Sequence, residues 1–162
     1  MNNRLNIVQK LIHRFAMQEP VREFFSTRMH RIDGVVLRYT NGKYTFSEFA
    51  GWPIVQLTTT GAKTGKLYAS PLIGLMDGEK IGLIASSFGR ERNPGWYYNL
   101  KAFPECEVQF RGSSAKYIAR ETEGNEREKY WQMAVFYYKG YELYKIRAAH
   151  RHIPVMVLEP VK

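Results

Sequence analysis

The residues with the clearest chemical potential lie in one short segment, 58–66, with the sequence Thr-Thr-Thr-Gly-Ala-Lys-Thr-Gly-Lys. This segment brings hydroxyl groups, turn amides and two lysines together at the end of a predicted strand. Backbone amides and cationic side chains can form a concave site for an anion. Glycine and threonine also build ordinary solvent-exposed turns. The spacing alone therefore leaves an anion-binding turn and a plain hairpin turn as equal interpretations.

A second group of candidates is polar and aromatic. Tyr138, Tyr141 and Tyr144 recur every three residues, so on a helical turn they would share one face. Their phenols could stack on a planar ligand or donate protons. From the residues alone, an aromatic stripe that only packs is the favoured interpretation. Ser86 could hydrogen-bond a ligand oxygen, although a buried serine bonded to the backbone is equally common.

Other familiar site patterns are absent from the sequence. It contains no phosphate-binding loop, no dinucleotide-binding glycine fingerprint, no paired-histidine zinc motif and no nucleophile elbow. His150 and His152 lack a third ligand at a recognisable spacing, so we predict no metal site. Cys106 is the only cysteine, which excludes an internal disulfide and fits a reducing cytoplasm.

Length and charge limit the classes of protein further. The 162 residues predict a single domain over 1–162. A net charge of +9 favours polyanionic partners such as nucleic acid, anionic lipid or a phosphorylated cofactor. The basic residues are scattered, which argues against a dedicated nucleic-acid-binding protein. No continuous apolar run marks a signal peptide or a membrane span, so we expect a cytoplasmic protein.

The first 31 residues are predicted to form an amphipathic helical segment. Leu5, Val8, Ile12 and Phe15 recur at helical spacing, and Pro20 is expected to divide the segment into two helical pieces. Packing on the core is the simpler interpretation of this segment. Peripheral contact with a membrane, or a place at a substrate entrance, stays open as the alternative. Residues 31–52 contain several turn signals and are predicted to be mainly loop.

The rest of the chain predicts strands with helices inserted between them. Strands are expected at 54–60, 67–76, 80–87, 106–111, 115–121 and 154–158, the first three as a meander. Helices are expected at 96–102 and 126–138, the first of them capped by Asn93 and begun by Pro94. Antiparallel hairpins with inserted helices indicate an α+β fold, a small β-barrel with peripheral helices.

Several motifs together resemble the deazaflavin-dependent nitroreductase family. The similarity runs from Leu57 to Pro160, about two thirds of the chain, and each fragment alone would be weak. The combination of Thr-Thr-Gly-x-Lys-Thr-Gly with Asn-Pro-x-Trp-Tyr-x-Asn-Leu is specific. The matching residues are 57–65, Ser70-Pro71-Leu72, Asp77-Gly78, Ala85-Ser86, 93–100, Tyr130-Trp131, the three tyrosines, Ile153-Pro154 and Glu159-Pro160.

This resemblance implies a split β-barrel of the FMN-binding type, with residues 53–160 as the cofactor-binding core. It implies an oxidoreductase that passes a hydride from reduced coenzyme F420, an 8-hydroxy-5-deazaflavin, to a quinone, a nitro compound or an activated alkene. By the same resemblance, the phosphate and anionic tail of the cofactor would contact Ala62, Lys63 and Thr64. The remaining cofactor contacts would be Tyr68, Ala69, Ser70, Pro71, Leu72, Ile73, Ile84, Ala85, Ser86, Ser87, Gly95, Trp96, Tyr97, Tyr98, Asn99 and Tyr141. The acceptor and its proton would be served by Ser86, Tyr138, Tyr141 and Tyr144.

Some positions depart from the family pattern. Tyr68, Ser70 and Ser87 stand where related sequences often carry other polar or charged residues. Ile73 stands where an aromatic residue can occur, which implies a reshaped acceptor pocket. Two alternatives remain at this stage: an FMN-dependent reductase of the same fold, and a non-catalytic protein that carries a lipid or a tetrapyrrole. A monomer and a homodimer are equally compatible with the sequence.

Overall fold

The computed structural model describes residues 35–36, 39 and 51–161. The predicted amphipathic segment 1–31 lies outside the described residues, as does most of the predicted loop at 31–52. Within that loop Val35, Val36 and Tyr39 are helical, so the expectation of a loop is wrong at these three positions. The turn signals at Gly34 and Asn41-Gly42 mark where an element can end. They do not require the residues between them to be irregular.

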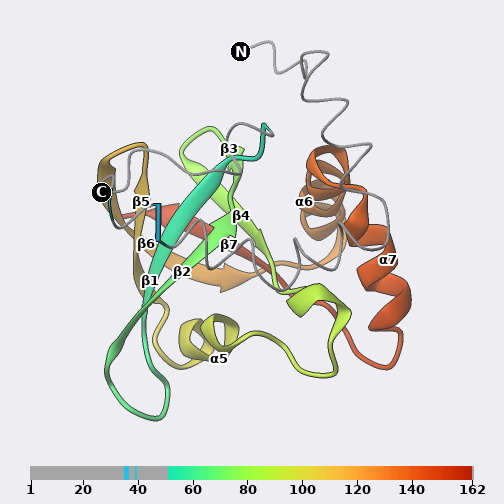
Figure 1. Ribbon diagram of the computed structural model, residues 1–162, viewed down its shortest axis with the longest axis horizontal. Helices are drawn as coiled ribbons and strands as arrows, with labels where there is room; N and C mark the ends of the chain where they lie inside the picture. Colours follow the sequence, from blue (N-terminus) through green and yellow to red (C-terminus); the bar gives the residue numbers. More distant parts are fainter. Residues whose placement is uncertain (1–34, 37–38, 40–50, 162) are drawn as a thin grey trace.

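Seven antiparallel strands form one sheet in the order β2-β1-β5-β6-β7-β4-β3. The strands are β1 (Ile54–Thr60), β2 (Leu67–Ile73), β3 (Leu75–Asp77), β4 (Lys80–Ile84), β5 (Glu105–Phe110), β6 (Ser113–Glu121) and β7 (Val155–Pro160). Strands β2 and β3 are the two edges of this order, yet only Gly74 separates them along the chain. The sheet therefore curls into a half-barrel (Figure 1), and the predicted α+β class is confirmed.

The predicted strand 67–76 is broken at Gly74. A Cβ atom there would lie 2.6 Å from Cγ1 of Val55, so only glycine lets the chain pass this closely over β1. The residues before Gly74 pair with β1 and those after it pair with β4, so the predicted three-strand meander is wrong. The apolar run Pro71–Met76 continues across the break, which hides the break from sequence analysis. The predicted strand 80–87 likewise ends early, because the 3-10 turn η2 (Ser87–Gly89) follows β4.

Within residues 51–161, three α-helices accompany the sheet. Helices α6 (Gly124–Tyr137) and α7 (Gly140–Arg147) lie beside each other at one side of the sheet, and α5 (Gly95–Ala102) lies apart from them (Figure 1). Helix α5 confirms the predicted helix at 96–102. Of the helices in the described part of the chain, none combines the length and apolar character needed to cross a membrane.

Two details of the predicted helices are wrong. Asn93 does not cap α5: Pro94 is the N-cap residue, and the side-chain oxygen of Asn93 instead accepts a hydrogen bond from Arg151. The predicted helix 126–138 ends at Tyr137, because Tyr138 has an extended backbone with φ −151° and ψ 106°. Tyr138 therefore does not share a helix with Tyr141 and Tyr144.

The buried residues form two clusters on different sides of the structure. One cluster is rich in aromatic residues and joins α6 and α7 to the sheet; it includes Trp52, Tyr130, Trp131, Tyr141 and Tyr144. The other lies between the strands and α5 and includes Leu57, Leu83, Trp96, Leu100 and Met156. Burial of a large apolar side chain contributes about 1.5–3 kcal/mol, so these clusters supply most of the driving force for folding. Together they fix α5 and α7 on either side of the strands between them.

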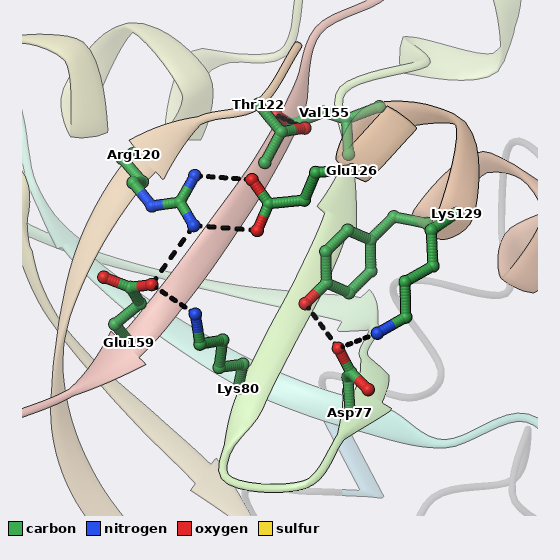
Figure 2. Close-up of polar contacts among 9 residues, drawn as sticks. Asp77, Lys80, Arg120, Thr122, Glu126, Lys129, Val155 and Glu159 are labelled. Atoms are coloured by element: carbon green, nitrogen blue, oxygen red, sulfur yellow. Dashed lines mark hydrogen bonds and ion pairs between the residues drawn. The ribbon is translucent and has the colours of Figure 1, made fainter. Parts of the chain in front are cut away.

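An ion-pair network ties α6 to three neighbouring strands (Figure 2). Arg120 on β6 donates from Nη1 and Nη2 to the carboxylate of Glu126 at 2.7 and 2.8 Å. Its Nη2 also donates to Glu159 on β7 at 3.1 Å, and Lys80 on β4 donates to the same carboxylate at 2.6 Å. The hydrogen bonds from Arg120 hold the pKa of Glu126 below its usual value. Because these groups are partly exposed, the Arg120–Glu126 pair is worth about 0–1 kcal/mol.

A second polar contact fastens α6 to the β3–β4 turn. Oδ2 of Asp77 accepts hydrogen bonds from Nζ of Lys129 at 2.6 Å and from the phenol of Tyr130 at 3.0 Å (Figure 2). The ring of Tyr130 covers Gly82, where a Cβ atom would lie 2.3 Å from the ring. Helix α6 thus needs a glycine on β4 beneath it.

Candidate functional site

Two adjoining cavities open beside the half-barrel. The larger, called here the main cavity, has a volume of about 940 Å³ and lies among β2, the end of β4, η2 and α7. The smaller, called here the turn cavity, has a volume of about 590 Å³ and lies between the β1–β2 turn and α5. Both are lined by Ser70, Pro94, Gly95 and Trp96. The two cavities therefore form one continuous groove with two unlike ends.

The β1–β2 turn closes on itself through backbone hydrogen bonds. The Gly61 amide donates to the Lys66 carbonyl at 2.7 Å, and the amides of Thr64 and Gly65 donate back to Gly61 at 3.2 and 2.8 Å. Gly65 has φ +67°, a conformation that favours glycine. The side chains of Lys63 and Lys66 are exposed on this turn, and neither has an acidic partner among the described residues. The turn thus carries two exposed positive charges, of which Lys63 lines the turn cavity.

Asn99 of α5 holds this turn against the sheet. Its side-chain oxygen accepts from the Ala62 amide at 3.0 Å, and its Nδ2 donates to Oγ1 of Thr59 at 3.0 Å. Thr59 is only 1% exposed, so its hydroxyl has no access to bulk water. The two motifs that carry the family resemblance are therefore in direct contact through Asn99. Its amide positions the turn while it also lines the turn cavity.

The main cavity has apolar walls and a polar end. Its apolar lining comprises Pro71, Leu72, Ile73, Leu83, Ile84, Phe88, Trp96 and Tyr141. Its polar lining comprises Ser70, Ser86, Ser87, Arg90, Glu91, Arg92 and Asn93. Sites for flat organic ligands are typically apolar clefts of this size with a few polar groups that fix orientation.

The loop after β4 forms one wall of the main cavity and has an unusual backbone. Ser87 and Phe88 have φ +48° and +58°, and Gly89 follows with φ +77°. A side chain in this left-handed region costs about 1–3 kcal/mol, so surrounding contacts must hold Ser87 and Phe88 in place. Their side chains both line the cavity. Such strain concentrates at functional sites.

The three tyrosines come together although Tyr138 lies in the link between α6 and α7, whereas Tyr141 and Tyr144 lie in α7. The ring centroids of Tyr138 and Tyr144 each lie within 6.1 Å of the Tyr141 centroid. Only Tyr141 lines the main cavity, whereas Tyr144 packs edge-on against Phe88 at 5.8 Å. Burial, and next the neighbouring Tyr138 phenol, raise the pKa of Tyr141 and of Tyr144 above the usual value. Both phenols therefore stay protonated at neutral pH and can donate a hydrogen bond.

Most of the predicted site residues line one of the two cavities. The main cavity contains Ala69, Ser70, Pro71, Leu72, Ile73, Ile84, Ser86, Ser87, Gly95, Trp96 and Tyr141. The turn cavity adds Ala62, Lys63, Thr64, Tyr68, Tyr98 and Asn99. Four predicted residues line neither cavity: Ala85, Tyr97, Tyr138 and Tyr144.

The positions of Ala85 and Tyr97 have simple physical causes. Side chains alternate at the end of β4, so Ile84 and Ser86 reach the cavity while Ala85 is fully buried on the other side. Tyr97 faces away on α5, and its hydroxyl donates to Glu121 at 3.1 Å.

Sequence reasoning missed the polar end of the main cavity. This end is lined by Arg90, Glu91, Arg92 and Asn93. Sequence reasoning also missed Phe88, which lines the apolar wall next to them. The sequence showed Arg90 and Arg92 as a short basic group, which was the available signal. Nothing local indicated that this segment folds back over the cavity.

Comparisons with known proteins identify the family of this chain. The model of the family described as F420H(2)-dependent quinone reductase matches residues 29–160. An F420H(2)-dependent quinone reductase of Mycobacterium tuberculosis is 32% identical over 131 residues, which cover 79% of this chain and 87% of that protein. A solved F420-H2 dependent reductase (FDR-A) is 42% identical, with a TM-score of 0.61, and the match covers 66% of this chain and 94% of that one.

A second solved structure, described as a domain-swapped dimer, is 36% identical with a TM-score of 0.64; the match covers 86% of this chain and 96% of that one. The comparisons thereby confirm the predicted family resemblance, the split-barrel fold, the enzyme class and the deazaflavin cofactor. With most of its length matched by the family model, this chain belongs to the F420H(2)-dependent quinone reductase family.

Proposed function

We propose that this chain binds reduced coenzyme F420 along the groove formed by the two cavities and uses it to reduce a quinone in the main cavity. The observation that carries the proposal is the contrast between the two ends of the groove. Lys63 is exposed at the turn cavity, with Lys66 on the same turn, whereas the main cavity has apolar walls away from the polar end that carries Arg90 and Arg92. A cofactor with an anionic tail and a planar ring has the same polarity along its length. When bound, reduced deazaflavin supplies the hydride for this reaction.

The β1–β2 turn would hold the phosphate and the anionic tail. Lys63 supplies a positive charge at the cavity edge, and Ala62 and Thr64 flank it. Asn99 keeps the turn in position through Ala62 and Thr59. The role of this region is to bind and orient the cofactor, because orientation is the main demand of a hydride transfer.

The main cavity would hold the ring and the acceptor. Pro71, Ile73, Ile84 and Trp96 offer apolar surfaces that exclude water from the reacting atoms. The neighbouring β2 residues Tyr68, Ala69, Ser70 and Leu72 would run along the cofactor, with Gly95 and Tyr98 on the opposite side.

Tyr141, Ser86 and Ser87 are the proposed polar contacts of the acceptor. The phenol of Tyr141 is protonated at neutral pH, so it would donate a hydrogen bond to a quinone oxygen and relay a proton to it from water. Tyr138 and Tyr144 lie behind Tyr141 and would fix the position of its ring. Nitro compounds and activated alkenes are further acceptors of the same chemical type.

We also propose that the enzyme is a homodimer and is located in the cytoplasm. The domain-swapped relative favours a homodimer over a monomer, which light scattering of the purified chain would test. A cytoplasmic location fits the lone Cys106, whose burial raises the pKa of its thiol to about 12. Contact of segment 1–31 with a membrane stays a prediction, and sedimentation with anionic vesicles would test it.

The proposal is tested by titrating the purified protein with F420 and, separately, with FMN, each followed by fluorescence quenching. We expect binding of F420 at micromolar concentration, followed by oxidation of its reduced form when menadione is added. Binding of FMN instead would favour the flavin-dependent alternative. Binding of neither, with lipid retained through purification, would favour a carrier and would contradict the proposed activity.

A further inference from the structure

The loop after β4 is held by a residue far along the chain. Arg151 follows α7, and its guanidinium group donates to three residues of the loop. Nη2 donates to the carbonyl of Ser86 at 2.7 Å, and Nε donates to the carbonyl of Arg90 at 2.9 Å. Nη1 donates to the side-chain oxygen of Asn93. A single planar group thus fastens both ends of the loop and its middle.

The hydrogen bonds from Arg151 lie on both sides of the strained stretch of backbone. The left-handed residues are Ser87, Phe88 and Gly89. The two carbonyls bound by Arg151, those of Ser86 and Arg90, lie immediately before and immediately after this run. If the run relaxed to a right-handed or extended backbone, the two carbonyls would change direction. They could not both remain bonded to one rigid guanidinium fork.

Helix α7 closes the other side of the loop. A Cβ atom on Gly89 would lie 2.7 Å from Cβ of Arg147 and 3.3 Å from the backbone of Tyr144. The ring of Phe88 packs edge-on against Tyr144. The loop is therefore confined between the guanidinium of Arg151 and the surface of α7.

The partners of Arg151 indicate a structural task for its charge. In the described part of the chain, no carboxylate forms an ion pair with Arg151, and its acceptors are carbonyl and amide oxygens. Partial burial lowers the pKa of the guanidinium. An arginine that gives up water to bind neutral backbone groups orders a segment of chain, because its five donors have a fixed geometry.

We infer that Arg151 is a positioning residue that sets the shape of the acceptor wall. By holding the left-handed run, it presents the side chains of Ser87 and Phe88 to the main cavity. The part of this inference that concerns the acceptor rests on the proposed function. Loss of Arg151 would enlarge the acceptor side of the main cavity or make its shape variable. The β1–β2 turn would stay unchanged.

The first test does not depend on activity. Trypsin cleaves after arginine, and Arg90 and Arg92 lie in the clamped loop as exposed residues. The variants Arg151→Lys and Arg151→Gln should release fragments ending at Arg90 or Arg92 roughly tenfold faster than the parent, as quantified by mass spectrometry. The matched control is Arg147→Gln, which removes an exposed arginine from α7 and retains the Cβ contact with Gly89. The control should be cleaved at the parent rate.

A rescue experiment distinguishes loss of the Arg151 hydrogen bonds from a general loss of protein stability. In Arg151→Ala, millimolar guanidinium ion should restore resistance to trypsin, and the same concentration of urea should not. If the Arg151 variants do not fold, Asn93→Ala removes only one of the three loop partners and should give an intermediate rate of cleavage. Parent-like cleavage of folded Arg151→Lys and Arg151→Gln would overturn the inference, as would parent-like cleavage of Asn93→Ala where those variants do not fold.

The second test is a split between kinetic constants. In Arg151→Lys, the KM for menadione should rise roughly tenfold, and the Kd for F420 should stay within about twofold of the parent. An unchanged KM together with faster cleavage would show that Arg151 holds the loop without influencing the acceptor. That result would overturn its role in shaping the acceptor wall. If the parent itself binds no F420, the proposed function fails, while the trypsin result still decides whether Arg151 holds the loop.

Discussion

The two ends of the groove are held in place in different ways. The β1–β2 turn closes through hydrogen bonds within residues 61–66 and is supported from nearby by Asn99 and by Tyr68, whose hydroxyl is hydrogen-bonded to Oγ1 of Thr64. The loop after β4 contains a strained left-handed run and depends on Arg151, which lies 61 and 65 residues from its two carbonyl partners. The proposed cofactor end is thus a self-contained unit, and the proposed acceptor end depends on the C-terminal part of the fold. Substitutions far from the cavity can therefore alter the acceptor end without disturbing the cofactor end.

The largest effect is expected from removing the support of the turn. Asn99→Leu would leave the exposed Ala62 amide to water and the buried Thr59 hydroxyl without its partner, at a cost of about 1–3 kcal/mol for the buried hydroxyl. We predict that F420 affinity falls by roughly ten- to a hundredfold, as measured by fluorescence titration. Asn99→Asp keeps an acceptor for the Ala62 amide and should lose less. Parent-like affinity in Asn99→Leu would show that the turn needs no outside support.

A smaller effect is expected from removing one charge on the turn. Lys63→Ala should weaken F420 binding by roughly three- to tenfold at low ionic strength, because the exposed charge acts through solvent. The loss should shrink at about 1 M salt, where the Debye length is only about 3 Å. The matched control is Lys116→Ala, an exposed lysine on β6 outside both cavities. Equal affinities for Lys63→Ala and the parent at low salt would remove the role assigned to Lys63.

At the acceptor end, Tyr141→Phe removes one hydroxyl and leaves the ring. We expect kcat to fall roughly tenfold, because the loss of a proton donor affects the transition state, with a smaller change in thermal stability. In the parent, burial raises the pKa of Tyr141, so its ionisation should cause no loss of turnover between about pH 6 and pH 9. Unchanged kinetics in Tyr141→Phe would mean that this tyrosine only packs.

The smallest effect at neutral pH concerns Tyr144, which supports the loop through Phe88. Its pKa is raised in the folded protein, chiefly by burial, so above about pH 10 the unfolded chain ionises while the folded chain stays neutral. The associated stability is fully present below that pH and is lost as the pH rises toward the folded pKa. Urea unfolding should therefore show a declining free energy above about pH 10, and Tyr144→Phe should make the decline shallower. The same slope in both proteins would contradict this assignment.

The difference between the two ends also explains what could be predicted from the sequence. The turn at Ala62, Lys63 and Thr64 was predicted because glycine and threonine spacing encodes local geometry that the chain itself completes, whereas the resemblance implied its role at the cofactor. Strand alternation was visible in the sequence, yet the resemblance-based site included Ala85 along with Ile84 and Ser86, which the alternation separates. Most strands and α5 were predicted for the same local reason.

The unpredicted features all depend on contacts between distant residues. Gly74 breaks a strand because Val55 lies beneath it, and no neighbour of Gly74 in the sequence signals this contact. Asn93 looks like a helix cap, but Arg151 takes its side-chain oxygen. Phe88, Arg90 and Arg92 reach the main cavity only because Arg151 and α7 fold the loop back over it.

One ligand should occupy both cavities, with its charged end at the β1–β2 turn. Hydrogen–deuterium exchange of the purified protein with and without F420 can show whether it does. We expect slower exchange on binding in two separate regions, residues 61–66 with 95–99 and residues 84–88. Protection of 84–88 without 61–66, or protection of neither region at saturating F420, would contradict it.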